Sequence, residues 1–206
     1  GVIHIILSRG YVLSLNYLID ETLAALRDVL KKPAEEVKKD VLDFFRGRLQ
    51  NQLITQGYAY DTVDAVLAAD IDDLTLVMAK IKALQDFRQH AEFEPVSIAF
   101  KRVDNILKGF AGGQADVNLL AHEAEIRLFS SLENVKTRVE KSVAEKDFPS
   151  ALLKFAALRP VVDAFFDSVM VMDKDEQIRQ NRLSLLYEIS ALFHKIADFS
   201  KIVTAG

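Results

Sequence analysis

Residues 152–201 read LLKFAALRPVVDAFFDSVMVM (152–172), DKDEQ (173–177) and IRQNRLSLLYEISALFHKIADFSK (178–201). In the last segment apolar residues recur every three or four positions, which is the spacing of one helix face: Leu185, Ile189, Leu192, Ile196 and Phe199. The first segment carries a similar stripe that includes Phe155 and Phe165. Two apolar segments joined by a short acidic turn predict a helical hairpin with one shared buried face, and Asp173 is expected to cap its second helix.

The same periodicity predicts helices through the rest of the chain, while strand signals are almost absent. Helices are expected over 1–9, 16–30, from Pro33 to a stop at Gly57, after caps at Asp61 and Asp72, over 96–107, and over 119–144. The sequence therefore predicts an all-α fold, a helical bundle in two helical parts. The polar stretch that ends at Pro95 suggests the division: residues 1–86 continue an upstream domain, and residues 87–206 form a second domain.

Composition narrows the class of protein. The chain has 206 residues, half of them hydrophobic, which is enough to bury a sizeable core. It has no cysteine, which excludes a disulfide framework and a thiolate metal site. No apolar run approaches the roughly 20 residues that span a bilayer. The net charge of −4 disfavours a general nucleic-acid coat, so an RNA contact must come from a local patch. We expect a cytoplasmic protein without DNA or membrane partners.

Motifs that carry chemistry are missing from the sequence. The glycines of GFAGG (109–113) lack the lysine and the strand–helix context of a phosphate loop, so this segment is predicted to be a flexible connector. His122 and Glu125 are three residues apart on a predicted helix, but a metal site of that type needs a matching pair from a second helix. No serine or cysteine nucleophile arrangement is present. The sequence predicts no catalytic residue, no metal site and no cofactor in this chain.

Polar residues on two predicted helices are the candidates for binding. They are Lys101, Arg102, Asn105, Lys108, Arg179 and Arg182. One interpretation is a set of solvated faces and ion pairs, in which Asp163 or Asp167 receives the arginines of the last helix. The other is an RNA surface, with arginine and lysine on phosphates and asparagine or arginine on base edges of a single-stranded loop. The residues alone leave both interpretations open.

Several segments resemble a known family. FKRVDNIL (100–107), ALLKFAALRPVVDAFFDSVMVM (151–172) and IRQNRLSLL (178–186) look like the C-terminal part of the bacterial glycyl-tRNA synthetase beta subunit. GVIHIIL (1–7) and FFRGRLQNQLITQGYAYDTVDAVLA (44–68) resemble the same subunit, so the resemblance extends over essentially the whole chain. It implies that the last hundred or so residues are an all-helical anticodon-binding domain, similar to that of arginyl-tRNA synthetases.

The resemblance also implies a function. The family's enzyme is a tetramer of two alpha and two beta subunits, in which alpha uses glycine and ATP for aminoacylation and beta binds glycine tRNA. This chain would then belong to a ligase without carrying its catalytic residues. Lys101 and Arg102 from FKRVDN would bind phosphates, while Asn105, or Arg179 or Arg182 from RQNR, would read anticodon bases. The alternatives are the tail of an arginyl-type synthetase and a helical scaffold that does not touch RNA. Clustering of four of the candidates on one face would favour RNA binding: Lys101, Arg102, Arg179 and Arg182.

Overall fold

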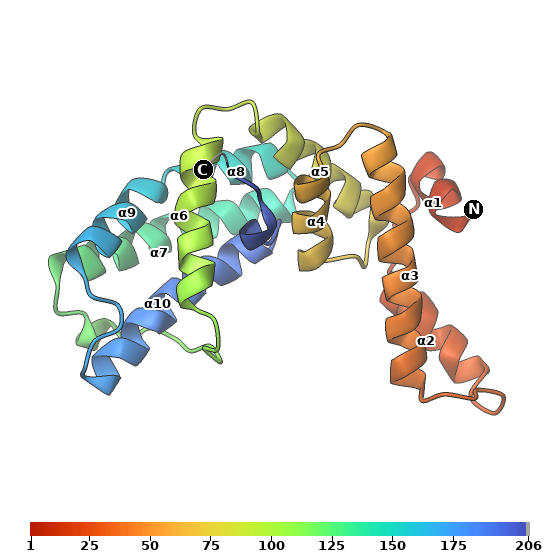
Figure 1. Cartoon of the computed structure of the whole chain (residues 1–206), viewed down its shortest axis with the longest axis horizontal. Coiled ribbons are helices and arrows are strands. Elements are labelled where there is room, and N and C mark those ends of the chain that lie inside the picture. Colours follow the sequence, from red (N-terminus) through yellow and green to blue (C-terminus); the bar gives the residue numbers. More distant parts are fainter. Residues whose placement is uncertain (205–206) are drawn as a thin grey trace.

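The computed structural model describes residues 1–204, and within that range every regular element is a helix, which confirms the all-α prediction. The α-helices are α1 (Val2–Arg9), α2 (Leu15–Ala25), α3 (Ala34–Thr55), α4 (Tyr60–Ala69), α5 (Leu74–Phe87), α6 (Phe93–Ile106), α7 (Glu123–Ala144), α8 (Phe148–Ala156), α9 (Arg159–Ser168) and α10 (Glu176–His194), with short 3₁₀ helices η1 (Val117–Leu119) and η2 (Phe199–Lys201). Helices α1–α3 lie at one end and α6–α10 at the other, with α4 and α5 between them (Figure 1). Across residues 1–204, no helix combines the length and the apolar character needed to cross a membrane.

The predicted helix boundaries differ from the observed ones where several acidic residues stand together. α10 begins after Asp175 rather than Asp173, and α5 begins after Asp73 rather than Asp72. Any of these carboxylates could cap a helix, and tertiary bonds decide between them. The carboxylate of Asp72, for example, accepts hydrogen bonds from Ser14 Oγ at 2.9 Å and from the Asn16 N–H at 2.7 Å.

Two other helices also begin at residues that differ from the predicted ones. α4 begins after Ala59, so Asp61 lies inside its first turn rather than at its cap. α7 begins after His122, because Leu119 belongs to η1 and the backbone is extended at Leu120 and His122. The predicted stop at Gly57 is confirmed: α3 ends two residues earlier and Gly57 has a φ of +95°, which favours glycine.

The predicted hairpin over residues 152–201 is wrong. Its first segment is divided into α8 and α9, because Pro160 lacks the N–H that a continuous helix needs at that point. α8 and α9 both pack against α7, whereas α10 packs against α6 and α7. The apolar stripes predicted from the sequence are present, but the helix that covers most of the first stripe is α7, which precedes it.

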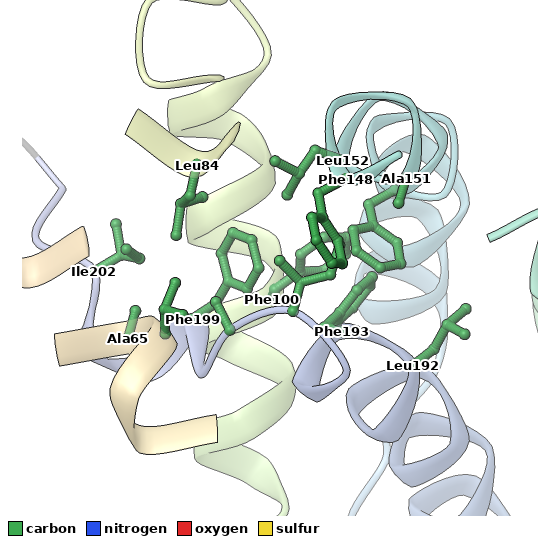
Figure 2. Packing of buried hydrophobic residues seen from close by; sticks show 14 of the residues in the cluster. Ala65, Leu84, Phe100, Phe148, Ala151, Leu152, Leu192, Phe193, Phe199 and Ile202 are labelled. Carbon is green, nitrogen blue, oxygen red and sulfur yellow. The ribbon is translucent and has the colours of Figure 1, made fainter. Parts of the chain in front are cut away.

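A cluster of buried phenylalanines forms the centre of the core (Figure 2). The ring of Phe193 on α10 stacks on Phe100 of α6 with 3.4 Å between centroids, and meets Phe155 of α8 edge-on at 4.5 Å. Removal of one such buried ring typically costs about 3–5 kcal/mol of stability. This cluster fixes the position of α10 relative to α6 and α8, and with it the surface that these helices present.

The core continues across residue 86, where the sequence suggested a division. Ala65 of α4 and Leu84 of α5 lie in the same cluster as Phe199 and Ile202 (Figure 2). The Asp198 N–H also donates a 2.8 Å hydrogen bond to the Ala65 carbonyl. The division into 1–86 and 87–206 stays a prediction, while the packing shows that α4 and α5 support the helices that follow them.

A buried ion pair holds the end of the described chain. Asp61 is 2% exposed, and both of its carboxylate oxygens lie 2.9 Å from Arg88 Nη1. The Val203 N–H donates a third bond to Asp61 Oδ2 at 2.8 Å. A carboxylate removed from water needs such compensation, so Asp61 ties the C-terminal segment to α4.

Candidate nucleic-acid interface

The candidate residues on α6 and just after it have different surroundings. Lys101 is half-buried, and its Nζ lies 3.5 Å from the Ile202 carbonyl in the C-terminal segment. Arg102 is exposed and places its guanidinium carbon 4.2 Å from the centroid of the Phe166 ring on α9. Asn105 near the end of α6 and Lys108, two residues after that end, are both exposed. Consecutive residues on a helix diverge by about 100°, which accounts for the different surroundings of the first two.

Asp104, three residues after Lys101 on α6, faces α10. It accepts a 2.6 Å hydrogen bond from Ser190 Oγ and lies 3.5 Å from His194 Nε2. The hydrogen bond to Asp104 raises the pKa of His194; burial opposes the rise, and the charges of Asp104 and Asp198 add to it. The imidazolium that these carboxylates favour forms an ion pair that joins α10 to α6.

Asp104, His194 and Asp198 hold potential metal-ligand atoms within 4.8 Å of one another, a grouping that the sequence did not predict. Their partners in the protein account for the grouping. Asp104 accepts the Ser190 hydroxyl, and Asp198 Oδ1 accepts the Ser200 N–H and hydroxyl at the start of η2. We therefore interpret the three residues as an ion pair next to a helix cap.

Arg182 lies inside the protein. Its side chain is 11% exposed; Nε binds the carboxylate of Glu125, which is 2% exposed, and Nη1 lies 2.7 Å from Asp173 Oδ2. Burial would raise the pKa of Glu125, but hydrogen bonds from the His122 N–H, the Arg182 guanidinium and the Ala121 N–H together hold it below its usual value. The charge of Arg182 is thus balanced by two carboxylates within the fold.

The prediction that Asp163 or Asp167 pairs with the arginines of α10 is wrong. Asp163 pairs with Arg159 on its own helix at 2.7 Å, because α9 and α10 do not form the hairpin that would have brought Asp163 to α10. Arg179 donates from Nη1 to the Asp173 carbonyl at 2.8 Å, and its Nη2 lies 3.8 Å from Glu176. Both arginines of α10 therefore bind the connection that leads into their own helix.

The structure only partly brings together the four residues whose clustering would favour RNA binding, Lys101, Arg102, Arg179 and Arg182. Arg102, Arg179 and Arg182 all contact the stretch from 166 to 173, at the end of α9 and in the connection after it. Lys101 lies apart, at the C-terminal segment. Three of the four residues thus surround one segment, but of these three only Arg102 is exposed.

The glycine-rich loop before α7 is packed along α10 rather than being a simple flexible connector. Asn181 of α10 exchanges two hydrogen bonds with the backbone of Asp116, at 2.6 and 3.0 Å. Gly112 has a φ of +99°, and a Cβ there would lie 2.9 Å from the Tyr187 ring. The glycines allow the loop to approach α10 closely.

His122 and Glu125, the pair considered above as half of a metal site, lie at the start of α7. They form a capping box there: His122 is the N-cap residue and Glu125 follows it by three positions.

Comparison with known proteins agrees with this architecture. The family model of the DALR anticodon binding domain matches residues 96–204, which include most of α6 and all elements from there through η2. The model of the glycyl-tRNA synthetase beta subunit matches residues 1–68. The two matches lie one after the other along the chain, with α5 (Leu74–Phe87) between them.

Curated relatives match almost the whole chain. The glycine–tRNA ligase beta subunit of Syntrophus aciditrophicus is 52% identical over 204 residues, which are 99% of this chain and 30% of the relative. The beta subunits of Syntrophotalea carbinolica and Geobacter metallireducens are each 46% identical over 202 residues, which are 98% of this chain and 29% of either relative. The chain thus spans about 30% of the length of these relatives. Because the anticodon-binding model covers more than half of its residues, the chain belongs to the DALR anticodon binding domain family.

Proposed function

We propose that this chain is the tRNA-recognition part of a glycine–tRNA ligase beta subunit and that residues 96–204 contact the anticodon arm of glycine tRNA. The observation that carries this proposal is the match of the anticodon-binding family to the helices α6 through α10. Relatives that match nearly the whole chain are named glycine–tRNA ligase beta subunits. These names support glycine as the amino acid and beta as the subunit.

In this proposal the chain binds and positions tRNA but carries no catalytic residue. An alpha subunit uses ATP and glycine, and two copies of each subunit assemble in the cytoplasm. Residues 1–86 pack towards the rest of the beta subunit, and residues 87–206 form the anticodon-binding domain. Binding energy from a remote part of a substrate can be used to hold its reacting end in place. Recognition of the anticodon arm would raise the rate of aminoacylation in this way.

Exposure ranks the candidate residues for RNA contact. Arg102, Asn105 and Lys108 reach solvent on α6 and just after it, so they are the best placed to meet RNA. The Lys108 ammonium would bind a phosphate and the Asn105 amide would read a base edge. Lys101 and Arg179 are partly buried, and Arg182 is occupied by carboxylates inside the fold. With a net charge of −4, the whole chain should bind RNA weakly and in a salt-dependent manner.

Two alternatives remain to be tested. The tail of an arginyl-type synthetase would share the anticodon-binding fold, but the match of residues 1–68 to the glycyl beta subunit disfavours it. A helical scaffold without RNA contact would agree with the burial of Arg182, and it differs from the proposal in its response to the anticodon.

The test is aminoacylation by the assembled enzyme of glycine tRNA and of the same tRNA with a changed anticodon. We expect kcat/KM to fall at least tenfold on changing the anticodon, since each lost base contact costs about 1–3 kcal/mol. Asn105→Ala should reduce the difference in kcat/KM between the two tRNAs. Lys108→Ala should lower kcat/KM for both tRNAs by the same factor. Lys39→Ala, at an exposed lysine on α3, is the matched control. Equal activity with both tRNAs in the wild-type enzyme would favour the scaffold.

A further inference from the structure

The connection between α9 and α10 exposes two large apolar side chains. Met170 is 73% exposed and Met172 is 58% exposed, whereas Val169 and Val171 are 6% and 4% exposed. The backbone at Val169 is extended, with φ −123° and ψ 124°, and successive side chains of an extended segment point to opposite sides. The two valines therefore anchor the segment in the core and the two methionines face solvent.

Arginines of α10 fix the backbone of this segment. Arg182 Nη1 donates to the Met170 carbonyl at 3.0 Å, and Arg179 Nη1 donates to the Asp173 carbonyl at 2.8 Å. The same Nη1 of Arg182 holds the Asp173 carboxylate at 2.7 Å, while its Nε binds the buried Glu125. The connection between α9 and α10 is already ordered in the folded protein. Binding of a partner to it therefore causes little further loss of conformational entropy.

The chemistry around the methionines suits an unpaired nucleobase. A thioether side chain is polarisable and adaptable, and it makes favourable contacts with flat aromatic rings. Lys174 follows Met172 by two positions and is exposed, and the exposed guanidinium of Arg102 lies on Phe166 near the end of α9. Proteins bind single-stranded RNA by combining flat or apolar surfaces for the bases with positive charges for the backbone.

We propose, resting on the proposed function above, that Met170 and Met172 form the surface on which unpaired bases of the anticodon loop stack. Arg182 is then a positioning residue: it holds the methionines in place through the backbone and does not itself contact RNA. Arg182 was a candidate for reading bases on the sequence alone, and its burial assigns it this indirect role.

The first test uses the full-length protein assembled with its partner subunit. Its affinity for glycine tRNA and for the isolated anticodon stem-loop is measured over a range of salt concentrations. Met170→Ala combined with Met172→Ala should weaken both complexes by about tenfold or more, since a lost base stack costs about 1–3 kcal/mol. The slope of log affinity against log salt should not change, because no phosphate contact is removed. Lys174→Ala should reduce that slope.

Two controls separate base stacking from loss of structure. Met170→Leu combined with Met172→Leu keeps the apolar surface and should retain most of the affinity. Leu153→Ala removes an apolar side chain of similar exposure, 49%, from α8 and should leave binding unchanged. Both methionines are exposed, so their replacement should leave the fold intact.

The positioning role of Arg182 has its own readout. Arg182→Gln should weaken RNA binding without changing the salt slope and should speed amide exchange in residues 169–175. A reduced slope would instead indicate that Arg182 contacts phosphate, and would overturn its positioning role.

The outcomes of these experiments are distinguishable. If the alanine double variant binds RNA like the wild type while the enzyme still discriminates anticodons, the stacking surface is refuted and the proposed function stands. If the variant fails to assemble with the partner subunit but its RNA affinity is unchanged, the methionines contact protein and the inference is also refuted. If the wild type does not discriminate anticodons, the proposed function itself fails.

Discussion

Arg182 of α10 and Glu125 of α7 form an ion pair with both side chains almost completely buried, at 11% and 2% exposed. The two residues are 57 positions apart in the sequence, so the pair connects two helices that are distant along the chain. A buried charge is stable only while its partner is present, so this contact belongs to the framework of the fold rather than to its surface. It also links the start of α7 to the connection that carries Met170.

Replacement of Arg182 should therefore destabilise the region around it. In Arg182→Ala the Glu125 carboxylate would remain buried without its cation, which typically costs about 3–5 kcal/mol. We expect faster amide exchange at the start of α7 and in residues 169–175 of the full-length protein. Arg127→Ala is the matched control: its pair with Glu123 is 62% and 81% exposed, so exchange should change little. Equal effects of the two variants would contradict the structural role.

The loop that packs on α10 predicts a compensating pair of substitutions. A Cβ at position 113 would overlap Ser184 Oγ, so Gly113→Ala should destabilise the loop by about 1–3 kcal/mol. Adding Ser184→Ala should restore most of the loss, because the nearest remaining Ser184 atom, its Cβ, lies 3.5 Å away. Amide exchange of residues 108–122 measures both effects.

Gly47→Ala is the control for this experiment. Gly47 lies within α3, and a Cβ added to it would have no neighbouring atom within 4 Å, so alanine should stabilise that helix by up to about 1 kcal/mol. Loss of protection in Gly113→Ala that persists in the double variant would show that the close approach to Ser184 is not the cause.

The contact between α6 and α10 should weaken as pH rises. The hydrogen bond to Asp104 raises the pKa of His194 above 6.5 in the folded protein, so protonated His194 stabilises the fold. This contribution is complete below the unfolded pKa of about 6.5 and is lost as pH rises through the higher folded value. Because the His194 side chain is 40% exposed, solvent screening keeps the effect small.

Urea unfolding of α6 and α10 measures this pH dependence when each sample is labelled by a brief pulse of hydrogen exchange at one fixed pH. In the wild type, the urea concentration at the midpoint of unfolding should decrease as the pH is raised from about 6 to about 8. His194→Gln should remove that part of the change. A midpoint that varies identically in both proteins would mean that His194 does not couple the two helices.

The C-terminal segment should depend on Asp61. Asp61→Asn removes the charge that Arg88 neutralises and weakens the acceptor of the Val203 N–H, so the last described residues should detach more often. Trypsin should then cleave faster after Lys201. Asp64→Asn is a control on the same helix: Asp64 pairs with Gln50 of α3 instead, so cleavage after Lys201 should be unchanged.

The sequence was sufficient for the helical class because helix periodicity is a local property. It identified Leu185 and Ile189 as core residues, and both are fully buried. It did not show which element covers each apolar stripe, so α7 was missed as the partner of α8 and α9. Periodicity indicates the direction in which a side chain faces but not what it meets.

The candidate site was harder to predict for the same reason. In the sequence, Arg182 and Asn105 are both polar residues on a helix face, yet one is buried in an ion pair and the other is exposed. The difference depends on Glu125 and Asp173, whose positions are set by the packing of α7 and by the connection after α9. Likewise, exposure of Met170 follows from the burial of its two valine neighbours, and only the folded chain reveals it.

Photo-crosslinking from the anticodon is the measurement that tests the central claim most directly. Glycine tRNA with a photoreactive base at an anticodon position is bound to the assembled enzyme and irradiated, and the attached peptides are identified. The account predicts crosslinks within residues 96–204, concentrated in 166–174 and at the exposed end of α6, and competed by unmodified glycine tRNA. Crosslinks confined to other parts of the enzyme would contradict the assignment of anticodon recognition to this domain.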